Sequence, residues 1–165
     1  MISFSALLWM LVVMFAIVGG TRGVKKEVLV TISIVAAVFA IVVIEQYFPF
    51  SGPDDLQFLV RGGIVTFCAV IGYQGQRIQQ ISDALIKSHW RNKIFGLVLG
   101  AANGYFLVTT LLFYLNKYNY PFPFVTPAGP ELAQWLEYSI PVWLVGQWAY
   151  VAVLIGILLI LLVFV

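Results

Sequence analysis

Cysteine and histidine are nearly absent from this chain, which has one of each, Cys68 and His89. A single cysteine cannot form an intramolecular disulfide, and it does not make a cysteine-based metal site. His89 follows Ser88, but neighbouring residues point apart on a helix and no carboxylate is placed to orient the ring. The apolar runs contain no histidine, which disfavours a histidine-ligated haem or chlorophyll within a membrane. We therefore predict that the chain is not an enzyme and has no catalytic residue, metal site or cofactor.

Charged residues are also scarce in this chain. Charged residues make up 10% of the sequence, whereas soluble domains carry about 25%. Hydrophobic residues make up 62%, and the mean hydropathy is +0.99. A chain of 165 residues cannot hide that much apolar surface from water, so its solvent must be lipid. The net charge of +2 is too small to indicate nucleic-acid binding.

Long apolar runs predict an all-α, polytopic membrane protein with four to five transmembrane helices in a single domain, residues 1–165. The expected spans are about 3–19, 28–48, 57–75, 94–115 and 141–165. The run at 28–48 would be about 31 Å long as a helix, enough to cross a bilayer. A basic cluster follows the first run rather than preceding it, which is the reverse of a secretory signal, so we expect this run to remain as a span.

Two segments have the pattern of helices that lie on the membrane surface. In the segment 76–91, Ile78, Ile81 and Leu85 share one helical face while the charged residues lie elsewhere. The segment 131–139 is shorter and contains Trp135 and Tyr138, residues that favour the interface. We therefore expect one or two interfacial amphipathic helices.

The basic residues predict an orientation. Seven of the nine lie in the connections after the first and third runs: Arg22, Lys25, Lys26, Arg77, Lys87, Arg91 and Lys93. Cytoplasmic loops are enriched in Lys and Arg, which predicts that this side is cytoplasmic and that the amino terminus is outside. We expect contact with lipid or a partner protein at Arg22, Lys25, Lys26, Glu27, Lys87, Arg91 and Lys93. Arg22 either only orients the chain or also holds a phosphate or carboxylate with its planar fork.

Two motifs stand beside the apolar runs. In the first, Gly23 allows a sharp turn and Glu27 falls in the first turn of the following helix, where a carboxylate suits the dipole. In the second, the glycines Gly96, Gly100 and Gly104 recur at every fourth residue and predict a close helix contact. The expected partner is the run 28–48, through its small residues Ser33, Ala36, Ala37 and Ala40. Asn103 is expected to hydrogen-bond across helices or, alternatively, to contribute to a substrate site.

In these motifs the chain resembles the colicin V production protein (CvpA) family. The family pattern Gly-x-Arg-Gly-x-x-x-Glu matches Gly20, Arg22, Gly23 and Glu27, and a later pattern matches residues 92–104. Ser139 and Pro141 fit a third element, so the resemblance spans roughly residues 5–141. Two features depart from the family: Ser5 stands where an Asp is common, and the final apolar run exceeds the usual four helices. The resemblance implies a bacterial inner-membrane protein linked to toxin production or export and to envelope maintenance, without an accepted catalytic mechanism.

Three functions fit these observations. The first is action by association with membrane lipids and a protein partner, without nucleic acid. The second is an accessory subunit of a respiratory or photosynthetic complex, and the third is a homo-oligomeric export channel. The spans carry no acidic residue at mid-depth, which disfavours a proton pump or an antiporter.

Overall fold

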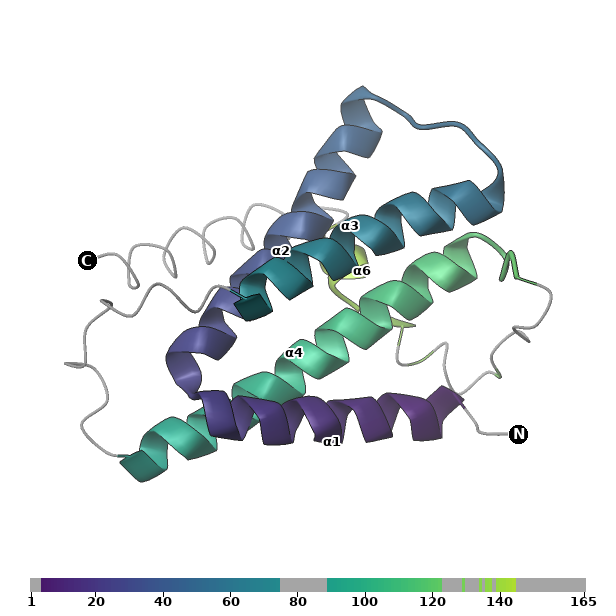
Figure 1. Cartoon of the computed structure of the whole chain (residues 1–165). Coiled ribbons are helices and arrows are strands. Elements are labelled where there is room, and N and C mark those ends of the chain that lie inside the picture. The colour runs from purple at the N-terminus through teal and green to yellow at the C-terminus, as the bar shows by residue number, and fades with distance from the viewer. Residues whose placement is uncertain are drawn as a thin grey trace.

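The computed structural model describes residues 4–74, 89–122, 129, 134, 136, 137 and 139–144. All regular secondary structure in this part of the chain is helical, as predicted (Figure 1). The helices are α1 (Phe4–Arg22), α2 (Val24–Tyr47), α3 (Asp54–Gln74), α4 (His89–Lys117) and the short α6 (Ile140–Leu144).

Within the described residues, three helices are long and apolar enough to cross a membrane, at Val24–Tyr47, Asp54–Gln74 and Trp90–Lys117. They correspond to the second, third and fourth predicted runs. A shorter apolar helix, Ala6–Arg22, corresponds to the first. The final predicted span, 141–165, and the predicted interfacial helices, 76–91 and 131–139, lie largely outside the described residues.

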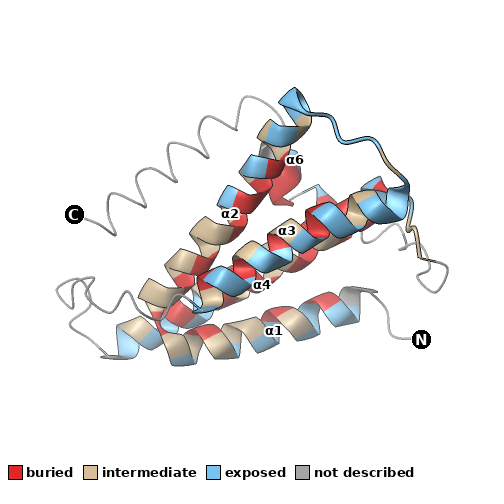
Figure 2. Cartoon of the chain, turned by 45° about the horizontal axis from the view of Figure 1, so that its top comes forward, coloured by how far each residue is buried: buried red, intermediate tan, exposed pale blue. Residues whose placement is uncertain are grey.

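The helices pack around two apolar clusters. α1 packs mainly against α4, while α2 packs against both α3 and α4. One cluster joins Val30 and Ile34 of α2 to Val65 of α3, and the other joins Leu8 of α1 to Val108 of α4. Figure 2 shows buried residues along the inner sides of the helices and exposed residues on their outer sides. The outer sides carry many large apolar residues, which suits helices surrounded by lipid.

The three α4 glycines contact α1, whereas we expected them to meet α2. A Cβ atom at Gly100 would lie 2.8 Å from the Cα atom of Gly19, and one at Gly104 would lie 2.7 Å from the Phe15 side chain. A Cβ atom at Gly96 would lie 2.5 Å from the Gly19 carbonyl oxygen. The glycine spacing identifies the face of α4 that permits close approach, but α1 supplies glycines of its own and so comes closer than α2.

The small residues of α2 that we expected at this contact are placed differently. Ala36 and Ala40 are exposed, whereas Ala37 belongs to the core. Ser33 meets α3, where a Cβ atom at Gly72 would lie 2.7 Å from its hydroxyl oxygen.

Gly23 separates α1 from α2. Its φ of 83° lies in the left-handed region, where a side chain is strained. Its amide still donates to the Gly19 carbonyl at 2.9 Å, so the chain leaves α1 in a regular turn before changing direction. Asn92 of α4 lies against this break, because a Cβ atom on Gly23 would be 2.8 Å from its side-chain amide. The first motif therefore builds a tight corner against the start of α4.

Candidate functional site

Arg22, the last residue of α1, points into the bundle. Its guanidinium donates to the Glu27 carboxylate at 3.1 Å and to the Tyr73 main-chain carbonyl at 2.7 Å. It also lies over the Tyr73 ring, 4.4 Å from the ring centroid. Its side chain remains 16% exposed. Arg22 thus ties the end of α1 to the start of α2 and the end of α3.

Glu27 is fully buried, and two helices besides its own supply its hydrogen bonds. Asn103 of α4 donates from its amide nitrogen to the Glu27 carboxylate and to the Glu27 main-chain carbonyl, each at 2.9 Å. The Asn103 oxygen accepts from the Thr31 hydroxyl at 2.6 Å. The same hydroxyl lies 3.0 Å from the Glu27 carbonyl. Asn103 therefore uses both ends of its amide to join α4 to α2.

These residues form a buried polar centre, which we define as Arg22, Glu27, Thr31, Tyr73 and Asn103. Each of the four long helices contributes to it. Removing a carboxylate and a guanidinium from water is costly unless the charges are paired and their remaining atoms are hydrogen-bonded. Here Arg22 neutralises the charge of Glu27 through one carboxylate oxygen, and the other oxygen accepts a hydrogen bond from Asn103.

The start of α2 is also held by α4. The Val24 amide donates to the Asn92 side-chain oxygen at 2.9 Å, across 68 positions of sequence. The first amides of a helix lack partners within the helix, and a side-chain oxygen commonly caps them from the preceding residue. Gly23 has no side chain to do so, and Asn92 caps the helix from another element instead.

A second polar cluster lies at the opposite end of α2. Glu45 pairs with Arg61 of α3 through a short contact and with Lys117 of α4 at 3.2 Å. The Arg61 guanidinium also donates to the Gln57 carbonyl at 3.1 Å and lies 5.0 Å from the Tyr118 ring centroid. Burial raises the pKa of Tyr118 to about 12, and Arg61 opposes this shift. The cluster joins α2, α3 and α4 where α2 ends.

Of the residues for which we expected lipid or partner contact, some face inward and others are exposed. Arg22 and Glu27 face inward and bond to each other. Arg91 and Lys93 are exposed, and Lys25 and Lys26 are partly exposed. Lys87 lies outside the described residues. Asn103, which we expected either to bridge helices or to contribute to a substrate site, is in the bridging position.

Sequence reasoning missed the burial of Glu27 and the parts played by Thr31 and Tyr73. One signal was available for Thr31, because residues four apart share a helical face and Thr31 follows Glu27 at that spacing. For Tyr73 the sequence offers no comparable signal, since its carbonyl meets Arg22 across 51 positions.

The profile of the family described as colicin V production protein matches residues 4–142, most of the chain. The chain belongs to this family. The matched range includes all five residues of the buried polar centre, and the predicted membership of the family is thereby confirmed. No curated protein and no solved structure matches the chain.

Membership agrees with the membrane-spanning character of the helices and with the prominence of helix packing. The colicin V production family is not a known enzyme family. In this member, the motif residues Arg22, Gly23, Glu27 and Asn92 all hold helices together.

Proposed function

We propose that this protein acts by association within the bacterial inner membrane, and that it serves the production or export of a toxin without catalysing a reaction. The family description supplies the link to colicin V production. The basic end of the bundle, at the starts of α2 and α4, would be cytoplasmic, and the amino terminus would be outside.

The proposal is supported by one observation: the side chains of the motif residues face the interior of the bundle and bond to one another. The guanidinium of Arg22 and the carboxylate of Glu27 face each other, and the Asn103 amide completes their hydrogen bonding. Groups engaged in this way stabilise the bundle and are poorly placed to bind a substrate. Because the motif residues have a structural role, we infer that the protein acts through the surface that it presents to other molecules.

Part of that surface suits another transmembrane helix. Ala36 and Ala40 of α2 are exposed and lie four residues apart, so they share one helical face. Small residues at this spacing allow the backbones of two membrane helices to approach closely. We propose that a partner helix packs here, either from a different protein or from a second copy of this chain.

Purification in a mild detergent, followed by mass spectrometry of the co-purifying proteins, tests the proposal. We expect either a foreign protein in stoichiometric amount or a homo-oligomer. The variant Ala36→Leu/Ala40→Leu should no longer bind the foreign protein or form the oligomer. Phe67→Leu, at an exposed site on α3, is the matched control and should retain it. A foreign subunit would favour an accessory role, and a homo-oligomer would favour an export channel. A monomer free of partners, obtained with the parent and both variants, would overturn association.

A second measurement tests the link to toxin. In a bacterium that secretes colicin V and lacks its own family member, the chain should restore toxin in the medium. Ala36→Leu/Ala40→Leu should restore less than Phe67→Leu does at equal membrane abundance. Equal restoration by the two variants would show that the Ala36 face has no part in toxin production.

A further inference from the structure

We propose that the joined starts of α2 and α4 form a binding surface for the phosphate groups of anionic phospholipids. We call this surface the basic corner, and it comprises Lys25, Lys26, Arg91 and Lys93. The proposal rests on the chain crossing a membrane, and it is independent of any protein partner.

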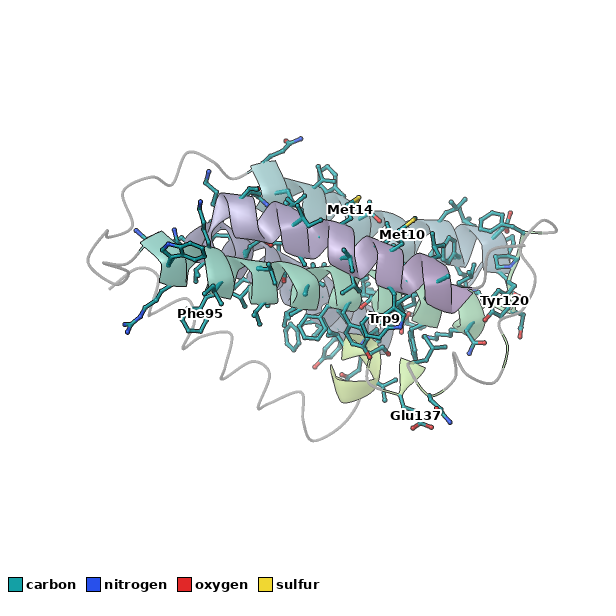
Figure 3. All side chains as sticks on the ribbon, turned by 90° about the horizontal axis from the view of Figure 1, so that it is seen from below. Trp9, Met10, Met14, Phe95, Tyr120 and Glu137 are labelled. Carbon is teal, nitrogen blue, oxygen red and sulfur yellow. The ribbon has the colours of Figure 1, made fainter. Side chains whose placement is uncertain are left out.

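The fold brings these four cations together from distant parts of the sequence. The hydrogen bond from the Val24 amide to Asn92 fixes the start of α2 beside the start of α4. Lys25 and Lys26 directly follow Val24, while Arg91 and Lys93 flank Asn92. Gly23 permits this close approach, since a Cβ atom there would lie 2.8 Å from the Asn92 side chain. Figure 3 shows nitrogen-tipped side chains gathered at the end of the bundle where Phe95 lies.

Arg91 and Lys93 are exposed, whereas the acidic residue in the described first turns of α2 and α4 is turned inward. The first turn of α4 contains no acidic residue, and that of α2 contains Glu27. Glu27 is fully buried and its carboxylate faces Arg22 and Asn103. The exposed cations Arg91 and Lys93 therefore present positive charge outward.

The depth of the basic corner favours lipid over a soluble acidic protein. The candidate spans begin at Val24 and Trp90, so all four cations lie within the first turn of a span. Trp90 is 75% exposed, and tryptophan is enriched at the level of the lipid headgroups. Lys and Arg at the ends of spans extend their charged groups toward the same level. A soluble protein would have to enter the headgroup layer to reach them, whereas lipid phosphates already lie there.

Trp90 offers a local reporter of the lipids around the basic corner. The full chain with Trp9, Trp135, Trp143 and Trp148 changed to Phe retains Trp90 as its single tryptophan. In phosphatidylcholine vesicles, brominated phosphatidylglycerol should quench it more strongly than brominated phosphatidylcholine at equal mole fraction. Arg91→Gln and Lys93→Gln should each lower the relative binding of phosphatidylglycerol by about fivefold, the effect of one Lys or Arg at an anionic surface.

Three controls separate the basic corner from general effects of charge. Lys117→Gln removes a cation at the other end of α4 and should leave the lipid preference unchanged. Arg91→Lys keeps the charge and should retain most of the preference. Raising the salt concentration should weaken the preference, because phosphate binding is screened.

Equal quenching of the parent by the two brominated lipids would overturn the proposal without requiring any variant to fold. A preference that survives Arg91→Gln/Lys93→Gln would do the same. These outcomes concern lipid alone, so they are distinguishable from failure to recover a protein partner.

Discussion

The position of Glu27 in the structure differs from what its sequence context suggests. In the sequence it is an acid in the first turn of a helix, beside three basic residues. In the structure its carboxylate is fully buried between Arg22 and Asn103. A carboxylate among apolar helices is tolerated when its charge is matched and its oxygens accept hydrogen bonds. Arg22 therefore acts as the counter-ion of Glu27.

Removing either charge of this pair alone should destabilise the protein more than removing both. Arg22→Met leaves Glu27 buried without its counter-ion, and Glu27→Met leaves Arg22 facing an apolar side chain. Each single change should lower the free energy of unfolding by about 3 kcal/mol. The double variant should recover part of that loss, because no unpaired charge remains. Titration of the unfolding in detergent with dodecyl sulfate measures these differences, and additive losses would show that the two side chains do not interact.

At the scale of elements, close contacts and ion pairs hold the helices at their two ends. Gly19 and Gly100 bring the backbones of α1 and α4 together. At the end of α2, Glu45 joins Arg61 of α3 and Lys117 of α4. The glycine contact depends on shape and the Glu45 cluster depends on charge, so they should respond differently to substitution.

Gly100→Ala should separate α1 from α4. The added Cβ atom would lie 2.8 Å from the Cα atom of Gly19 and would also meet the Phe15 carbonyl oxygen. Both obstacles are backbone and cannot rotate away, so we expect a loss of about 1–3 kcal/mol and a lower melting temperature in detergent. Gly63→Ala is the matched control, because a Cβ atom at Gly63 has nothing within 4 Å. If both variants melt like the parent, α1 and α4 are not in close contact at this position.

In the second cluster, Glu45→Gln should be more damaging than Lys117→Gln. The Arg61 side chain is 6% exposed and would lose its counter-ion, whereas the Lys117 side chain is 41% exposed and water can solvate it. We expect a loss of about 1.5–3 kcal/mol for Glu45→Gln and less than about 1 kcal/mol for Lys117→Gln. Melting in detergent at low and high salt measures both. A larger effect of Lys117→Gln would contradict the assignment of Arg61 as the main partner of Glu45.

At the scale of the whole molecule, the two polar clusters mark opposite ends of α2, and their surroundings differ in charge. The buried polar centre lies beside the basic corner. The Glu45 cluster includes Arg61 of α3, and the first turn of the same helix carries Asp54 and Asp55. Because Lys and Arg favour the cytoplasmic side of a membrane, this asymmetry predicts that the basic corner is cytoplasmic and that the loop between α2 and α3 is outside.

Cysteine labelling in intact cells tests this orientation. With Cys68 replaced by alanine, Gly52→Cys should react with a membrane-impermeant thiol reagent, because position 52 lies between α2 and α3. Thr21→Cys, at an exposed position beside the basic corner, should react only after the membrane is permeabilised. The reverse labelling pattern would mean that the protein has the opposite orientation in the membrane. Labelling of both sites in intact cells would contradict a membrane span between them.

The sequence by itself determined the broad class, the approximate positions of four apolar helices and the family. Scarce charge and long apolar runs leave lipid as the solvent, and a helix satisfies its own backbone hydrogen bonds there. The motifs around Gly23 and Gly100 also predicted a sharp turn and a close helix contact, since glycine has no side chain to prevent either.

Only the tertiary structure decided which elements meet. The spacing of Gly96, Gly100 and Gly104 selects a face of α4, but it carries no information on the neighbour, which is α1 rather than α2. Likewise, an acid near the start of a helix can face water, lipid headgroups or the protein interior. Glu27 faces the interior because two partners lie there. The turn at Gly23 places Arg22 next to its carboxylate, and the packing of α4 brings Asn103 within hydrogen-bonding distance. Such pairings depend on how helices distant in sequence pack against one another.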